Sequence, residues 1–251
     1  MRCAVAVGTV AIRLKTLHDD PMTSIVWLSD QDPPDAFPPV DSALRDPDGL
    51  LAAGGDLSPK RLIAAYRRGI FPWYSRGQPI LWWSPHPRMI LVPSELKVSR
   101  SLAKTLRNGG FEVRIDKDFD KVIAACGDSA LRPEGTWISP DMRRAYVELH
   151  KLGYAHSAAT YRDGELVGGL YGIALGKVFF GESMFSRESD ASKVALKVLC
   201  DELRRREFTL IDCQMTTAHL ASLGAKTISR SQFSAILEND AQPPDPLGNW
   251  H

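Results

Sequence analysis

The sequence lacks the signatures of several protein classes. No apolar run in its 251 residues approaches the ~20 residues that span a bilayer. Apolar residues make up 44% and charged residues 24%, as in a globular protein rather than a disordered chain, a collagen or a coiled coil. The P-loop, the dinucleotide fingerprint, H-E-x-x-H and G-x-S-x-G are absent. Because nothing predicts activation of a substrate by ATP, a transferase of this sequence needs a donor that is already activated.

Cysteine is also scarce. Cys3, Cys126, Cys200 and Cys213 form no C-x-x-C pair and no His/Cys group with zinc spacing. We therefore expect reduced thiols in a cytoplasmic protein, with no metal and no cofactor. Residues 1–21 match a signal peptide poorly, and Met22 offers an alternative start. We expect those residues to be a disordered or untranslated extension and assign them no function.

The net charge is small, but its distribution is uneven. The whole chain carries a formal charge of +1. Between Leu57 and Arg114 there are eleven Lys/Arg and two Asp/Glu, a net of +9, and the remainder carries −8. A basic segment of this kind indicates a polyanionic partner, which the average charge hides.

Helix and strand signals predict a small N-terminal domain (22–87), a larger domain (88–240) and a tail (241–251). Ser58 and Pro59 are typical of a helix start, and Gly69 of its end. Residues 70–93 are rich in Trp and Pro, so we expect them to be irregular. The tail contains three prolines, and we expect it to be loosely held.

The larger domain shows a meander, a helix and a strand, which define an α+β fold with the helix covering one sheet face. Helices are predicted at Ser99–Asn108, Asp118–Cys126, Ser139–Gly153 and Asp190–Arg206. Strands are predicted at Tyr154–Tyr161, Glu165–Leu175, Val178–Phe185 and Thr209–Met215.

Three polar residues interrupt apolar strands. Glu182 follows apolar or small residues, and a buried carboxylate must be paired or hydrogen-bonded. It is either catalytic or a structural carboxylate held by backbone N–H groups. Alternation places Asp212 and Gln214 on one face of their strand, where they need a polar partner unless that face is solvated.

Two nearby residues could act as nucleophile or base. Cys213 points away from Asp212 and Gln214, so we expect a buried small hydrophobe rather than a nucleophile. For His219 a capping or surface role is the simpler expectation.

An aromatic and basic region could grip a single-stranded nucleotide end, because cations bind phosphates and flat rings stack on bases. At least half of its tryptophans are expected in a core instead. The region comprises Trp73, Tyr74, Trp82, Trp83 and Trp137, with Arg67, Arg68, Arg76 and Arg88.

Eight stretches, in order between Phe37 and Phe233, resemble the leucyl/phenylalanyl-tRNA–protein transferase family. They are Phe37–Pro39, Asp46–Pro59, Gly69–Trp73, Trp82–Pro85, Gly135–Ile138, Gly168–Gly172, Gly181–Ser186 and Ile211–Gln214. The resemblance implies an aminoacyltransferase that moves Leu or Phe, and less readily Met, from tRNA to proteins beginning with Arg or Lys. The new N-terminus marks the acceptor for degradation by the N-degron pathway.

The resemblance also implies a GNAT-like C-terminal domain. Ser186–Lys193 stands where such domains carry an acetyl-CoA pyrophosphate loop, so coenzyme A is not expected. We expect a monomer that binds aminoacyl-tRNA and an acceptor protein, without a membrane.

The resemblance assigns catalysis to Asp212 and Gln214. The donor ester is already reactive and an α-amine has a pKa of about 7.7–8.0, so a weak base suffices. Our hypothesis is that the Gln214 carbonyl holds the amine while Asp212 supplies negative charge. Glu182 either binds the donor or orients the other two.

The remaining assignments concern the donor. The resemblance places the tRNA 3′ end and its aminoacyl group on Trp73, Trp137, Tyr66, Leu170, Phe179, Met184 and Ile211. The tRNA backbone is expected on Arg67, Arg68, Arg76 and Arg88.

Two rival functions stay open at this point. One is a GNAT-like acyltransferase with another donor, which RNase treatment would leave active. The other is a non-catalytic RNA-binding protein, which would leave Glu182, Asp212 and Gln214 without a role.

Overall fold

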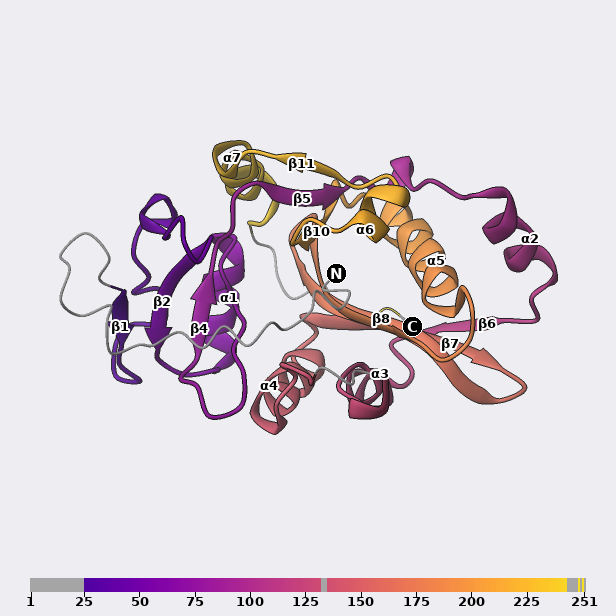
Figure 1. The fold of residues 1–251 in the computed structure, drawn as a ribbon, viewed down its shortest axis with the longest axis horizontal. Helices are drawn as coiled ribbons and strands as arrows, with labels where there is room; N and C mark the ends of the chain where they lie inside the picture. Colours follow the sequence, from indigo (N-terminus) through magenta and orange to yellow (C-terminus); the bar gives the residue numbers. More distant parts are fainter. Residues whose placement is uncertain (1–24, 132–134, 243–247, 249, 251) are drawn as a thin grey trace.

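The computed structural model describes residues 25–131, 135–242, 248 and 250, which form two lobes (Figure 1). The N-terminal lobe is built on a four-stranded sheet and the larger lobe on a seven-stranded sheet. Within those residues no helix is long and apolar enough to cross a membrane. The expected extension, residues 1–21, lies outside the described residues, as does most of the tail.

The N-terminal lobe has the strand order β1-β2-β4-β3. Its helix α1 begins as predicted, because the Ser58 hydroxyl accepts the Arg61 N–H and Pro59 opens the first turn. Its elements are β1 (Val26–Leu28), a 3-10 turn (Val40–Ser42), β2 (Leu50–Gly54), α1 (Pro59–Arg67), β3 (Phe71–Pro72) and β4 (Leu81–Trp83).

The larger lobe has the strand order β11-β5-β10-β9-β8-β7-β6. Its strands are β5 (Arg88–Leu91), β6 (Glu112–Ile115), β7 (Ala155–Arg162), β8 (Glu165–Leu175), β9 (Val178–Ser186), β10 (Leu210–Gln214) and β11 (Lys226–Ile228). Its helices are α2 (Arg100–Asn108), α3 (Phe119–Cys126), α4 (Pro140–Lys151), α5 (Ala191–Arg205), α6 (Ala218–Ser222) and α7 (Arg230–Asp240), with 3-10 turns at Pro93–Glu95 and Ser129–Leu131.

The α+β fold expected from the sequence is confirmed. Strands β7, β8 and β9 form the antiparallel meander, and β10 follows α5 and pairs in parallel with β9. Helix α5 covers one face of this sheet, and α3 and α4 cover the other (Figure 1). This is the arrangement that the GNAT-like expectation required.

Residues 70–93 are irregular over most of their length, as expected, but three short strands were not foreseen. Strands β3, β4 and β5 lie there, of two, three and four residues. Runs this short, separated by prolines, show no alternation from which a strand could be predicted. Their pairing instead depends on distant partners, since β5 lies between β10 and β11.

Helix α7 packs against the N-terminal lobe. Arg230 donates to the Ser84 carbonyl oxygen over 2.7 Å. At Gly69, which has a φ of +71°, a Cβ would stand 2.9 Å from the Phe233 ring. The glycine therefore ends α1 and also admits α7 against it.

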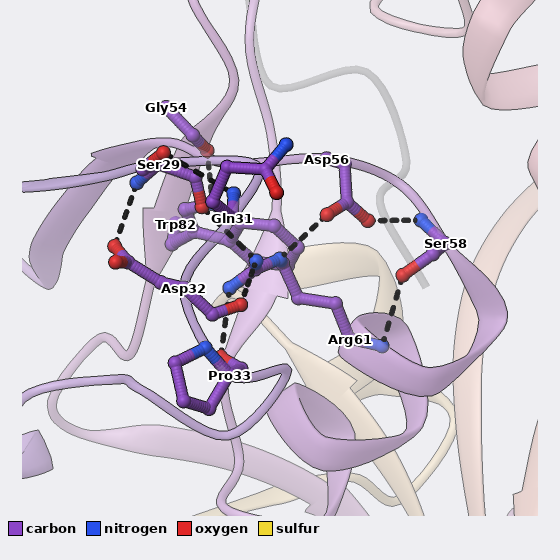
Figure 2. Close-up of polar contacts among 9 residues, drawn as sticks. All are labelled: Ser29, Gln31, Asp32, Pro33, Gly54, Asp56, Ser58, Arg61 and Trp82. Atoms are coloured by element: carbon purple, nitrogen blue, oxygen red, sulfur yellow. Dashed lines mark hydrogen bonds and ion pairs between the residues drawn. The ribbon is translucent and has the colours of Figure 1, made fainter.

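A buried arginine organises the start of the N-terminal lobe (Figure 2). Arg61 is 1% exposed, and its guanidinium donates to the carbonyl oxygens of Ser29, Asp32 and Pro33 and to the Asp56 carboxylate. These contacts hold the segment after β1 against α1.

We expect Arg61→Met to lower the free energy of unfolding by about 1–3 kcal/mol, because the carbonyl oxygens of Ser29, Asp32 and Pro33 lose their donor. Denaturant unfolding followed by fluorescence measures the change. Arg76→Met, at an exposed position, is the matched control and should leave the midpoint unchanged. A midpoint equally unchanged in Arg61→Met would contradict a structural role for this cluster.

The expectation of a loosely held tail was wrong for Trp250. Its side chain is 5% exposed, and its ring stacks on His156 with the centroids 3.9 Å apart. Its backbone N–H donates to Asp116, which also contacts the His156 ring over 2.7 Å. Burial lowers the pKa of His156 below its usual value, so the ring is neutral at pH 7.

Candidate active site

Two neighbouring strands separate at the candidate site. Strand β10 pairs with only the first residues of β9, Val178–Phe180, although β9 continues to Ser186. The register also skips Glu182 between β9 and β8, and Cys213 between β10 and β5. Each skipped residue is a β-bulge, which re-aims the side chains around it. The two bulges lie next to the opening between β9 and β10.

Glu182 is the centre of a buried polar cluster. Its Oε1 accepts the Tyr66 hydroxyl and the Gln214 Nε2, each over 2.7 Å, and its Oε2 accepts the Tyr146 hydroxyl over 3.0 Å. All four side chains are fully buried. The three donors compensate the cost of burying the carboxylate. Side-chain donors therefore satisfy the Glu182 carboxylate, where the sequence had suggested backbone N–H groups.

The two tyrosine hydroxyls of the cluster take part in three oxygen–oxygen contacts. The Tyr66 and Tyr146 hydroxyl oxygens also lie 2.5 Å apart. Two phenol hydrogens must then serve three oxygen–oxygen contacts within this triangle, two of them to Glu182. The two phenols and the carboxylate therefore form one closed hydrogen-bonded triangle.

Asp212 pairs with a buried arginine of the adjacent strand. Arg88 donates through Nε to Oδ1 over 2.8 Å and through Nη2 to Oδ2 over 2.6 Å. In the register Asp212 faces Ile90, which lies two residues from Arg88 on the same face of β5. The pair is formally neutral, so Asp212 adds little net negative charge to the site.

Gln214 is held by both neighbours. Its backbone N–H donates to Asp212 Oδ1 over 2.9 Å, and its φ of 62° is left-handed. Its Nε2 donates to Glu182, which directs its carbonyl oxygen Oε1 the other way. Glu182 and Asp212 together thus fix the orientation of the Gln214 side-chain amide.

Two predicted roles need correction. Arg88 is 1% exposed and bound to Asp212, so it cannot contact the tRNA backbone as expected. Asp212, neutralised by Arg88, does not supply the free negative charge of the original hypothesis. Glu182 is the carboxylate that contacts the Gln214 side chain, which favours its orienting role.

Sequence reasoning missed Tyr146, which lies on α4 and contacts both Glu182 and Tyr66. It falls on the apolar face of its predicted helix and is typical of a core tyrosine there. No signal in the sequence distinguishes it from one.

The aromatic residues expected at the donor come from both lobes. Tyr66 lies on α1 and reaches Glu182 across the lobe boundary. Trp73 is half-buried, and Trp137 is 5% exposed. The hydroxyls of Tyr74 and Ser139, 3.4 Å apart, bring together the segments that carry the two tryptophans. Trp82 and Trp83 are core residues.

The four apolar donor residues belong to one cluster under α5. Leu170 pairs across the sheet with Met184, and Phe179 with Ile211. Leu170, Phe179 and Ile211 are fully buried, and Met184 is 5% exposed. Because the cluster joins β8, β9 and β10 where β9 and β10 begin to separate, it forms an apolar wall on the α5 face of the sheet.

A groove of about 410 Å³ adjoins this wall. Met184 lines it together with Asp190, Lys193 and His219. Asp190 occupies the N-cap position of α5, as predicted, but its carboxylate binds Lys193 instead of capping the helix. Burial and the charge of Lys193 lower the pKa of His219 below its usual value. His219 is half-buried and lines this groove.

The other predicted tRNA contacts differ in accessibility. Arg76 is exposed, and Arg67 is half-buried in a groove of about 320 Å³. Arg68 donates to the carbonyl oxygens of Asp35, Phe37 and Pro38, which is a structural role.

The basic segment has a more accessible surface on α2. Arg100, Lys104 and Arg107 are exposed at i, i+4 and i+7, so they share one helix face. They form no ion pair with any residue that the structure describes. Thr105 contacts Asp190 over 3.4 Å, which places α2 beside the groove near Met184. Sequence reasoning had counted these charges without assigning them.

The described cysteines do not supply a nucleophile. Cys126, Cys200 and Cys213 are buried, and burial raises the pKa of Cys213 to about 11. A thiol of this kind is protonated at neutral pH and unreactive. Cys213 joins the apolar cluster, as expected.

Fold and site together define an α+β protein with a buried cluster of carboxylate, amide and phenol groups at the point where two strands of its sheet separate. Comparison with protein families gives a more specific result. Residues 90–238 match the family model "Leucyl/phenylalanyl-tRNA protein transferase", and residues 55–86 match its N-terminal domain. The chain belongs to this family.

Several curated relatives are similar over most of their length, and all three below bear the name leucyl/phenylalanyl-tRNA–protein transferase. That of Aromatoleum aromaticum is 62% identical over 90% of this chain and 94% of its own. That of Chromobacterium violaceum is 56% identical over 90% and 96%. That of Nitrosomonas eutropha is 57% identical over 86% and 92%.

Solved structures resemble the chain only loosely. A GCN5-related N-acetyltransferase from Kribbella flavida is 12% identical over 68% of this chain and 61% of its own, with a TM-score of 0.35. L-PGS from Bacillus licheniformis is 10% identical over 65% and 55%, with a TM-score of 0.38. The fold assignment stands on the strand order instead.

Proposed function

We propose that this protein transfers Leu or Phe from aminoacyl-tRNA to the α-amine of an acceptor protein. Family membership supports this function. The observation that carries it is the buried Gln214 side chain, whose amide is fixed by Glu182 and whose backbone is held by Asp212. No nucleophilic side chain is required, because the donor ester is already reactive.

The chemistry balances without a cofactor. The neutral acceptor amine attacks the ester carbonyl, a C–N bond forms, and the bond between the carbonyl carbon and the ribose oxygen breaks. The amine loses one proton and the ribose oxygen gains one. Gln214 positions the amine, and the triangle of Glu182, Tyr66 and Tyr146 relays the proton. The apolar wall under α5 receives the Leu or Phe side chain.

The assay that tests the proposal mixes the protein with labelled Leu-tRNA and a peptide that begins with Arg. We expect the peptide to gain one Leu and expect RNase pretreatment to abolish the gain. An identical peptide with an acetylated N-terminus is the control, because it has no free α-amine. Transfer that survives RNase, or RNA binding without any transfer, would contradict the proposal.

Finer features of the function follow the family resemblance. We propose acceptors with N-terminal Arg or Lys, Met as a poorer donor, a role in the N-degron pathway, and a cytoplasmic monomer. The absence of a C-x-x-C pair from a chain with only four cysteines supports a reducing compartment. The acidic charge outside residues 57–114 supports a cationic acceptor.

We further propose that the exposed face of α2 holds the tRNA backbone. Each phosphate contact contributes about 0.7–0.9 to the slope of log affinity against log salt. We expect Arg100→Ala, Lys104→Ala and Arg107→Ala each to weaken tRNA binding and to flatten that slope. The maximal transfer rate at saturating tRNA should not change. Filter binding over a range of salt concentrations measures the slope.

The matched control is Arg204→Ala, at an exposed cation that lies 3.9 Å from Asp201. It should bind tRNA with the wild-type salt slope. Slopes equal to wild type in all three α2 variants would exclude this helix as the tRNA surface.

A further inference from the structure

We propose that Arg88 is a positioning residue for catalysis, which fixes Asp212 and, through it, the backbone of Gln214 opposite Glu182. The inference rests on the proposed function and deepens it, because it gives a part in the reaction to a residue that the substrates do not touch. Three structural observations support it.

The first observation is the geometry of the ion pair. Arg88 and Asp212 meet through two hydrogen bonds of 2.8 and 2.6 Å, and their side chains are 1% and 0% exposed. A planar guanidinium that binds both carboxylate oxygens fixes the plane of the carboxylate as well as its distance. An ammonium group at the same place would fix only a distance. Arg88 therefore gives the Asp212 carboxylate a single orientation.

The second observation is the link from Asp212 to Gln214. Oδ1 of Asp212, which accepts from Arg88, also accepts the Gln214 backbone N–H over 2.9 Å. Gln214 has a φ of 62°, a conformation that non-glycine residues keep only when their surroundings impose it. From this backbone its amide reaches Glu182 over 2.7 Å. An unbroken set of hydrogen bonds thus runs from Arg88 to Glu182.

The third observation is the packing of the guanidinium itself. Its Cζ lies 5.0 Å from the Phe71 ring centroid and 4.7 Å from that of Phe233. Phe71 belongs to β3 of the N-terminal lobe, and Phe233 belongs to α7. A cation is attracted to aromatic rings, and here it is also confined between them. Arg88 therefore locates the end of β10 relative to both lobes.

A purely structural role explains this arrangement less well. A buried ion pair contributes little net stability compared with apolar side chains of similar volume. Its value lies in fixing directions, and the direction fixed here is that of Gln214. Many residues contribute to the stability of the fold, whereas Arg88 and Asp212 together fix the position of the Gln214 amide.

The experiment measures kcat, the KM for Leu-tRNA, and the melting temperature of purified variants in the peptide assay. The variants are Arg88→Lys, Arg88→Met, Asp212→Asn and the double variant Arg88→Met/Asp212→Asn. We expect both Arg88 variants to lower kcat by about 100-fold, the effect of a misplaced group of about 1 Å, with an unchanged KM. Because Arg88 acts through Asp212, the double variant should be no slower than Asp212→Asn alone.

The matched control is Arg61→Lys, at another arginine that is 1% exposed but belongs to the cluster of Figure 2. It should lower the melting temperature and leave kcat unchanged. If Arg88→Met leaves Asp212 unpaired and fails to fold, the double variant removes both charges and supplies the comparison with Asp212→Asn.

Two results would overturn the inference. One is a folded Arg88 variant with the wild-type kcat, and the other is a double variant slower than Asp212→Asn by the full factor of the Arg88 change. In both cases the wild-type protein still transfers Leu. Absence of transfer by the wild-type protein would instead overturn the proposed function.

Discussion

Glu182→Gln is expected to lower the rate of transfer by about 10²–10⁴-fold, the range in which proton-transfer groups contribute. The variant keeps the shape of the side chain but replaces one acceptor oxygen with an NH₂ donor. Three donors, from Tyr66, Tyr146 and Gln214, now converge on Glu182. At least one of these donors would then face the NH₂ group, and Glu182 would lose one of its two acceptor oxygens together with its negative charge. Single-turnover transfer from labelled Leu-tRNA measures the effect.

The control is Glu165→Gln, an equivalent change at an exposed position of β8. It should transfer at the wild-type rate. Tyr146→Phe should fall between Glu182→Gln and wild type, because it removes one donor and leaves the carboxylate. Wild-type transfer by Glu182→Gln, with Leu-tRNA bound normally, would exclude Glu182 from the reaction.

Gln214→Ala should lower transfer by about 10²–10³-fold, as the loss of a preorganised polar group does in other acyl transfers. Gln214→Glu should behave differently. Two carboxyl groups about as close as the present 2.7 Å contact cannot both ionise easily, so the introduced carboxyl group and Glu182 would share a proton. A protonated carboxyl group donates and accepts as the amide does.

The pH dependence distinguishes these variants. The ratio of Gln214→Glu activity to wild-type activity should be highest at about pH 6. It should fall toward about pH 9, because the shared proton is then lost. Gln214→Ala should show a constant ratio, since it has no group to protonate. A constant ratio for Gln214→Glu as well would contradict direct contact between residue 214 and Glu182 in the working enzyme.

Local sequence signals predicted much of the larger lobe. Ser139 followed by Pro140 starts α4, and the Ser139 hydroxyl accepts the Met142 N–H as an N-cap should. The turns at Asp163–Gly164 and Gly176–Lys177 divide the meander as expected. These features depend on residues a few positions apart, which is the range over which capping and turn chemistry act.

The site depended on contacts at longer range. Arg88 and Asp212 are 124 residues apart, so the basic side chain was counted as a surface charge. Tyr66 and Tyr146 are 80 residues apart, and each fits the apolar face of its own helix. The bulge at Glu182 inserts one residue into a paired strand, and alternation alone cannot reveal it.

Tyr66 and its acceptor Glu182 lie in different lobes, and this affects how the activity responds to heating. The tyrosine hydroxyl comes from α1 in one lobe and its acceptor, Glu182, from β9 in the other. A slight separation of the lobes would leave each sheet and helix intact, yet would remove one donor from the carboxylate. Loss of turnover should therefore precede loss of the circular dichroism signal on warming. Enzyme activity would then report a separation of the two lobes at a lower temperature than circular dichroism does.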